Sequence, residues 1–120
     1  MPAYEWIQYK NKRILYMNII AREKEVLREK IATIEPIVEK EPHKSILCIS
    51  DVTGGVANAE ITQMLKNFTK HNEPYIKMTA VIGVEGIKNI IFRGVLMFTG
   101  RKNLVLKNSK QEALDWLVEQ

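Results

Sequence analysis

The chain of 120 residues lacks several features that identify common protein classes. It has one cysteine, Cys48, so no internal disulfide can form, and this residue lies in the most apolar stretch of the chain. We therefore expect a buried, unreactive thiol in a reducing compartment. No stretch approaches the roughly 18 uninterrupted apolar residues of a membrane-spanning helix, and the N-terminus lacks the apolar region of a signal peptide. These absences predict a soluble, cytoplasmic protein without an integral membrane segment.

Charge of one sign does not accumulate anywhere in the sequence. There are 18 Lys and Arg residues against 14 Asp and Glu residues, a net charge of +4, and the two signs are interspersed. A nucleic-acid-binding protein would gather its basic residues on one element with aromatic residues between them, whereas aromatic residues make up only 8% of this chain. The pattern favours an ordinary solvated surface and argues against nucleic acid as a partner.

The sequence also lacks a recognisable metal, cofactor or catalytic motif. His43 and His71 have no Cys, Asp or Glu at the spacing that zinc ligands require. We expect His71 at the C-terminal end of a helix, where a partly protonated ring is favoured. A nucleophile needs a neighbouring base, and Cys48 in a buried strand is badly placed for one. We therefore expect no metal, no cofactor and no catalytic residue, and hence a protein that is not an enzyme.

What the sequence does contain is a regular alternation of strand and helix patterns. The expected elements are a hairpin of Tyr4–Tyr9 and Arg13–Ile20, helix Glu23–Lys40, strand Ser45–Ser50, a helix from Asn58 to about Asn72, strand Tyr75–Val84, helix Ile87–Thr99, strand Asn103–Lys107 and a final helix capped by Ser109. Pro36 should kink or break the first helix near Glu35. The order ββαβαβαβα predicts a single α/β domain over residues 1–120, with helices packed on a mixed, mostly parallel five-stranded sheet.

The most informative stretch runs from Ser45 to Gly55. Residues 45–50 predict a fully buried central strand, and an Asp and two glycines then predict a turn. Ligand sites in α/β folds lie at the carboxyl ends of such strands. The candidate loop residues for a ligand or a partner are Asp51, Thr53, Gly54, Gly55, Asn58, Gly83 and Gly86.

Two interpretations of this turn stay open. A carboxylate, a hydroxyl and a flexible backbone could bind a small polar ligand or a partner loop. Alternatively, Asp51 caps local N–H groups and the glycines supply unusual dihedral angles, which the residue types favour. An enzyme that uses Asp51 and Thr53 is a third, weaker hypothesis. The turn from Gly83 to Gly86 could bind an anion, but it lacks the fingerprint of a dinucleotide site or a P-loop, so a plain turn is favoured.

The helix expected at Ile87–Thr99 has a second apolar side. At about 100° per residue, Phe92 and Leu96 fall opposite the stripe that would face the sheet. Such a pair suggests contact with another protein, a second copy of the chain or a lipid headgroup region, unless a neighbouring element covers it or it is ordinary exposed surface. The interaction-surface candidates are Lys88, Asn89, Phe92, Arg93 and Leu96.

The element order, the passage Ile46–Gly55 and the closing Glu112–Leu117 resemble the STAS-like family related to anti-sigma-factor antagonists, over nearly the whole chain. The likeness is closest to small stand-alone bacterial domains described as STAS-like or CRAL-TRIO-like, and further segments carry it: His71–Lys77, Ala80–Gly86 and Phe98–Arg101. The resemblance implies a STAS-like sheet and a general role in interaction. The antagonists carry a phosphorylatable Ser at the helix start after the third strand, where this chain has Asn58–Ile61 without a hydroxyl. Partner switching by phosphorylation is therefore not carried over, unless Thr53 substitutes.

Two functions are expected ahead of an enzyme. The first is a non-enzymatic interaction or ligand-sensing domain of STAS-like type, forming a homodimer or binding another protein through Phe92 and Leu96. The second, which the CRAL-TRIO side of the resemblance implies, is a carrier or sensor of a lipid or other apolar small molecule. Peripheral membrane contact is compatible with either. A pocket between the end of the third strand and the start of the third helix would distinguish them, because a filled gap leaves only roles at the surface.

Overall fold

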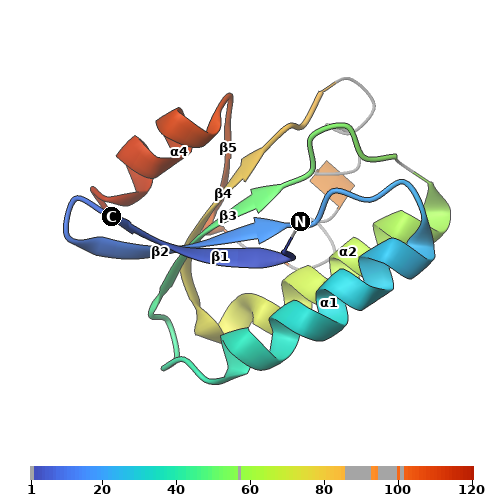
Figure 1. Cartoon of the computed structure of the whole chain (residues 1–120), viewed down its shortest axis with the longest axis horizontal. Coiled ribbons are helices and arrows are strands. Elements are labelled where there is room, and N and C mark those ends of the chain that lie inside the picture. The colour runs from blue at the N-terminus through green and yellow to red at the C-terminus, as the bar shows by residue number, and fades with distance from the viewer. Residues whose placement is uncertain (1, 57, 86–92, 95–99, 101) are drawn as a thin grey trace.

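The computed structural model describes residues 2–56, 58–85, 93–94, 100 and 102–120. Its elements are Tyr4–Tyr9 (β1), Lys12–Asn18 (β2), Lys24–Glu39 (α1), Ile46–Asp51 (β3), Ala59–Asn72 (α2), the 3-10 turn Glu73–Tyr75 (η1), Ile76–Ile82 (β4), Leu104–Lys107 (β5) and Lys110–Leu117 (α4) (Figure 1). The expected α/β order is confirmed over these residues. The helix expected at 87–99 lies outside them, except for Arg93 and Gly94, which are helical.

The five strands form one sheet in the order β1-β2-β3-β4-β5. β1 is antiparallel to β2, and every other neighbouring pair is parallel. This confirms the mostly parallel sheet with one antiparallel strand from the hairpin. The hairpin turns at Lys10 and Asn11, whose φ angles of 48° and 68° supply the left-handed conformation that a two-residue turn requires.

Helices cover the sheet on both faces. Figure 1 shows α1 and α2 side by side on one face and α4 on the other. Residues of β3 alternate between the two layers: Ile46 and Cys48 pack towards α1 and α2, whereas Leu47 and Ile49 pack towards α4. All residues of β3 are buried, so the expected central strand is confirmed, and so is the burial of Cys48. The strand begins one residue later than expected, because Ser45 is exposed, and it includes Asp51.

The first helix continues through Pro36, so a break near Glu35 is wrong, while the alternative of a kink there stays a prediction. Proline removes one backbone hydrogen bond from a helix, but Pro36 lies on the exposed side of α1. Ile34 and Val38, on either side of it in sequence, are completely buried. Their packing against the sheet holds the last turn in place.

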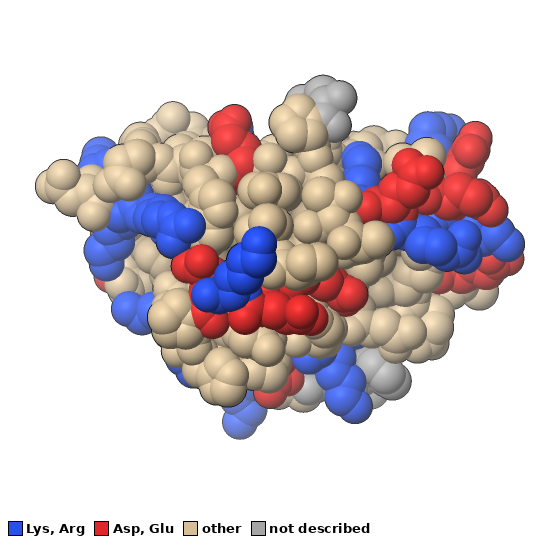
Figure 2. Space-filling view, turned by 60° about the horizontal axis from the view of Figure 1, so that its bottom comes forward, with Lys and Arg blue, Asp and Glu red and all other residues tan. Residues whose placement is uncertain are grey.

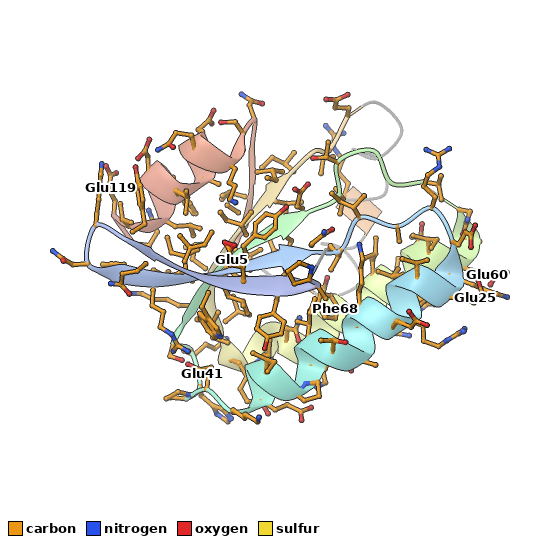
Figure 3. The ribbon with its side chains drawn as sticks, in the orientation of Figure 1. Glu5, Glu25, Glu41, Glu60, Phe68 and Glu119 are labelled. Atoms are coloured by element: carbon orange, nitrogen blue, oxygen red, sulfur yellow. The ribbon has the colours of Figure 1, made fainter. Side chains whose placement is uncertain are left out.

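Side-chain caps fix the starts of the two later helices. Asn58 Oδ1 accepts a hydrogen bond from the Ile61 N–H at 2.9 Å, and Ser109 Oγ accepts one from the Glu112 N–H at 3.1 Å. Both caps were expected from the residue types. The cap of α2 directs its apolar side inward, where Phe68 points from the helix towards the sheet (Figure 3).

Charges of both signs lie next to each other on the surface. Figure 2 shows acidic and basic side chains interspersed on the face that it presents. Arg13 and Glu41 form an ion pair at 2.8 Å, and Lys24 and Glu60 form one at 3.0 Å. Within the ranges that the structure describes, no helix has the length and apolar character needed to cross a membrane.

Candidate functional site

Asp51 lies at the carboxyl end of β3 and is only 8% exposed. Its Oδ1 accepts hydrogen bonds from the Thr53 N–H at 2.9 Å and the Thr53 hydroxyl at 2.6 Å. Its Oδ2 accepts the Tyr16 hydroxyl at 2.5 Å. Both carboxylate oxygens are thus satisfied from within the chain. This geometry favours the interpretation of Asp51 as the group that holds the turn over that of a ligand-binding carboxylate.

Tyr16 is a site residue that the sequence did not reveal. It comes from β2, which pairs in parallel with β3 and places Asn18 opposite Asp51. Burial, and then the hydrogen bond to Asp51 and the negative charge of Asp51, raise the pKa of Tyr16 well above its usual value. The ammonium group of Lys110 lies 4.4 Å from the ring centroid of Tyr16. Because its pKa is raised, the phenol of Tyr16 stays protonated and donates to Asp51.

A partly buried amine, that of Lys30, lies near the same strand ends. Lys30 Nζ reaches from α1 and donates to Asn18 Oδ1 at 3.1 Å and to the Ile20 carbonyl at 2.5 Å. Burial lowers the pKa of Lys30, and the charge of Asp51 opposes that shift. These bonds tie α1 to the end of β2, so Lys30 has a structural role here.

The turn after β3 lies directly against the turn after β4. Gly83 has a φ of 85°, and a Cβ added to it would lie 2.5 Å from Thr53 Cα and closer still to its N and Oγ1 atoms. The Val52 N–H also donates to the Ile82 carbonyl at 3.0 Å. Of the candidates from the sequence, the fold therefore brings Asp51, Thr53 and Gly83 together.

The remaining candidate residues are placed separately. Gly54 is exposed with a φ of 75°, and its carbonyl accepts a hydrogen bond from Arg22 at 3.4 Å. The Gly55 N–H donates to the Val52 carbonyl at 3.1 Å, which closes the turn. Arg93 is exposed. Outside the described residues lie Gly86, Lys88, Asn89, Phe92 and Leu96.

His71 joins the C-terminal ends of α1 and α2. Its Nε2 lies 2.6 Å from Glu39 Oε2, and its Nδ1 lies 2.8 Å from Asn72 Oδ1 and 3.6 Å from Glu35 Oε2. Burial lowers the pKa of His71, but the hydrogen bonds to Asn72 and Glu39 and the charges of the two glutamates outweigh burial, so the net shift is upward. No group of three or more potential metal ligands is found among the residues that the structure describes.

A raised pKa of His71 predicts a pH-dependent stability. The protonated ring stabilises the folded state below the ordinary histidine pKa of about 6.5, and this contribution is lost as the pH rises through the folded-state pKa. We expect urea unfolding to show a loss of at most about 1 kcal/mol in stability as the pH rises from about 6 through the folded-state pKa, because the ion pair is near the surface. The variant His71→Gln should lack this part of the pH dependence. An equal pH dependence in both proteins would contradict the prediction.

A cavity of about 90 Å³ lies between α2 and the sheet. The segment after β3 borders it with Val52, Gly55 and Val56. The wall also includes Val84, just after β4, and Leu104, the first residue of β5. The other described residues of its wall are Met17, Ile19, Ala21, Cys48, Ser50, Ile61, Thr62, Leu65, Phe68, Thr69, Asn72, Ile76, Thr79 and Val81. The wall is mostly apolar, and of its described residues none is charged. A space that reaches the end of the third strand is therefore present, whereas the start of the expected third helix, the other side of the pocket in question, lies outside the described residues.

The cavity had only a weak signal in the sequence. Ala21, Cys48, Ser50 and Thr79 are small residues that share its wall, and small side chains opposite a helix leave space that larger ones would fill. Their common face follows from the alignment of strands that are distant in the sequence. Composition and periodicity do not report that alignment.

Comparison with known proteins leaves the family open. The chain matches no family model, and neither the curated proteins nor the solved structures contain a significant match to it. The resemblance to the STAS-like family therefore stays a prediction, beside an α/β fold that the structure establishes.

Proposed function

We propose that this domain is a non-enzymatic sensor or carrier of a small apolar molecule, which binds in the cavity between α2 and the sheet. The cavity is the observation that carries the proposal, because concave, mostly apolar sites with a few polar groups are the usual binding places for small molecules. Its volume of about 90 Å³ is below the roughly 300–1,000 Å³ of sites for drug-sized ligands. It is closer to, but still smaller than, the roughly 150 Å³ cavity that admits benzene. A small ligand or one end of a larger one fits this space.

The bonding of Asp51 supports a role without catalysis. Its two oxygens are occupied by Thr53 and Tyr16, so the carboxylate is poorly placed to accept a proton from a substrate. Thr53 Oγ1 donates its proton to Asp51 and is pressed against Gly83. The pair that would serve an enzyme instead holds two turns together.

Toluene tests the proposal, because it is apolar and about the size of benzene. We expect saturating toluene to shift the amide NMR signals of cavity residues such as Ser50 and Leu65 and to leave those of α4 unchanged. The variant Leu65→Trp places a large ring at the cavity wall and should abolish these shifts. The matched control Asn67→Trp adds the same ring to the exposed side of α2 and should preserve them. Wild-type signals that do not respond to toluene would overturn the proposal.

The role as a protein-interaction domain stays a separate prediction. Its expected homodimer depends on Phe92 and Leu96, which lie outside the described residues. The cytoplasmic location, the peripheral membrane contact and the STAS-like family also stay predictions from the sequence. None of these is needed for a ligand to bind in the cavity.

A further inference from the structure

Among the described residues, the Ser50 hydroxyl on the cavity wall has no hydrogen-bond partner. Ser50 is 8% exposed and lies on the wall. Over the described part of the chain, every fully buried side-chain nitrogen or oxygen has a hydrogen-bond partner, yet no bond to the Ser50 hydroxyl is found there. This oxygen is therefore reached from the cavity and not enclosed by protein. A molecule in the cavity would meet a hydroxyl that can both donate and accept.

Two other polar residues of the wall, Thr79 and Asn72, have partners within the chain. Thr79 Oγ1 lies 3.1 Å from Cys48 Sγ, so this hydroxyl already has a partner. Asn72 is 3% exposed, and its Oδ1 lies 2.8 Å from His71 Nδ1. Asn72 precedes the start of β4, whereas Ser50 is near the carboxyl end of β3. Ser50 and Asn72 therefore lie towards opposite ends of the cavity.

The charge of the wall limits what can bind. No Lys, Arg, His, Asp or Glu is among the described residues of the wall. An ion moved from water into such a site loses its hydration without gaining a partner, which is far more costly than burying a neutral polar group. Desolvation of a neutral hydrogen-bonding group costs little free energy if the group bonds to Ser50, because the new hydrogen bond replaces those with water.

We infer that the cavity selects a neutral, largely apolar molecule with one hydrogen-bonding group, and that the Ser50 hydroxyl recognises this group. The inference rests on the proposed ligand-binding function and adds the ligand's chemistry to it. It excludes carboxylates and phosphates as the part of a ligand that enters the cavity. A small alcohol, phenol or neutral amide has the required chemistry.

Three probes of similar size separate these properties: toluene, phenol and benzoate at neutral pH. Their affinities are measured by NMR titration on the full chain, in wild type and in Ser50→Ala. We expect Ser50→Ala to weaken the affinity for phenol about threefold to tenfold, as for the loss of one hydrogen bond. The affinity for toluene should change by less than about twofold. Benzoate should bind wild type at least about tenfold more weakly than phenol.

Two further variants isolate the hydroxyl. Ser50→Cys nearly keeps the side-chain size but has only a weak donor. The affinity for phenol should therefore be weaker in this variant as well. Ser45→Ala removes an exposed serine just before the same strand and should leave all three affinities unchanged. Far-UV circular dichroism checks that each variant is folded.

The failures of the two proposals are distinguishable. If toluene does not bind wild type, the ligand-binding function itself is wrong, and this inference with it. If toluene binds but phenol keeps its affinity in Ser50→Ala and Ser50→Cys, recognition by Ser50 is wrong while the function stands. If benzoate binds wild type as tightly as phenol, the selection of a neutral ligand is wrong.

Discussion

Replacing Gly83 with alanine should lower the free energy of unfolding by about 3–5 kcal/mol, the largest effect that we expect from a single methyl group. Two causes add. Gly83 has a φ of 85°, in the left-handed region that a Cβ disfavours. The new Cβ would also overlap the backbone of Thr53, which cannot move aside as a flexible side chain would. Urea denaturation of wild type and variant measures the difference.

Gly54→Ala is the matched control for Gly83→Ala. Gly54 has a similar φ of 75°, but an added Cβ there meets no atom within 4 Å. It should therefore show only the conformational cost, about 1–2 kcal/mol. The excess loss in Gly83→Ala reports the contact between the two turns. Equal losses in the two variants would show that Thr53 and Gly83 are not in close contact in solution.

Replacing Asp51 with alanine should lower the free energy of unfolding by about 2–4 kcal/mol. The substitution removes the acceptor of three hydrogen bonds, from the Tyr16 hydroxyl and from the Thr53 N–H and hydroxyl. Asp51 is 8% exposed, so water replaces these bonds only in part. Urea denaturation again gives the change. A loss below about 0.5 kcal/mol, the usual range for a surface substitution, would return Asp51 to the list of ligand-binding candidates.

The phenol of Tyr16 gives a second, independent readout of the same contact. Its pKa is raised by burial and by the bond to Asp51 and its charge, so Asp51→Asn, which removes the charge, should let Tyr16 ionise at a lower pH. Ultraviolet titration of tyrosinate follows this change, and Tyr16→Phe identifies which transition belongs to Tyr16. Tyr16→Phe itself should destabilise less than Asp51→Ala, because it removes one of the three bonds.

Local residue chemistry predicted much of this fold. Asn58 and Ser109 cap helices, as their side-chain oxygens favour. The branched and apolar run after Ser45 forms the buried central strand, because only a strand covered on both faces tolerates so few polar residues. Helix caps and buried strands can be predicted in this way because they depend on residues that are close together in the sequence.

The outcome at Pro36 depended on packing that the sequence does not display. A proline inside a helix costs a hydrogen bond, and the sequence alone therefore predicted a kink or a break. Burial of Ile34 and Val38 against the sheet offsets this loss, and α1 continues to Glu39. A tertiary contact outweighed a local preference.

The position of the candidate site was predicted from the sequence, and its composition only in part. Asp51 and Thr53 were expected at the carboxyl end of the central strand, where they do lie. Tyr16 was not expected, and Gly83 was expected only as part of a separate turn; they lie 35 and 32 residues away from Asp51 in sequence. Only the register of β2, β3 and β4 brings these residues together.

The sequence by itself determined the order of the elements, the helix caps, the buried central strand and the turn at its end, because each follows from the conformational and solvation preferences of adjacent residues. The tertiary structure alone decided that Asp51 is satisfied by Tyr16 and Thr53. It also decided that small residues from several strands face α2 across a cavity, where the Ser50 hydroxyl has no partner among the described residues. Strand register and helix placement decide which of these residues come into contact and how much space is left between α2 and the sheet. They result from the packing of the whole chain, to which every distant segment contributes.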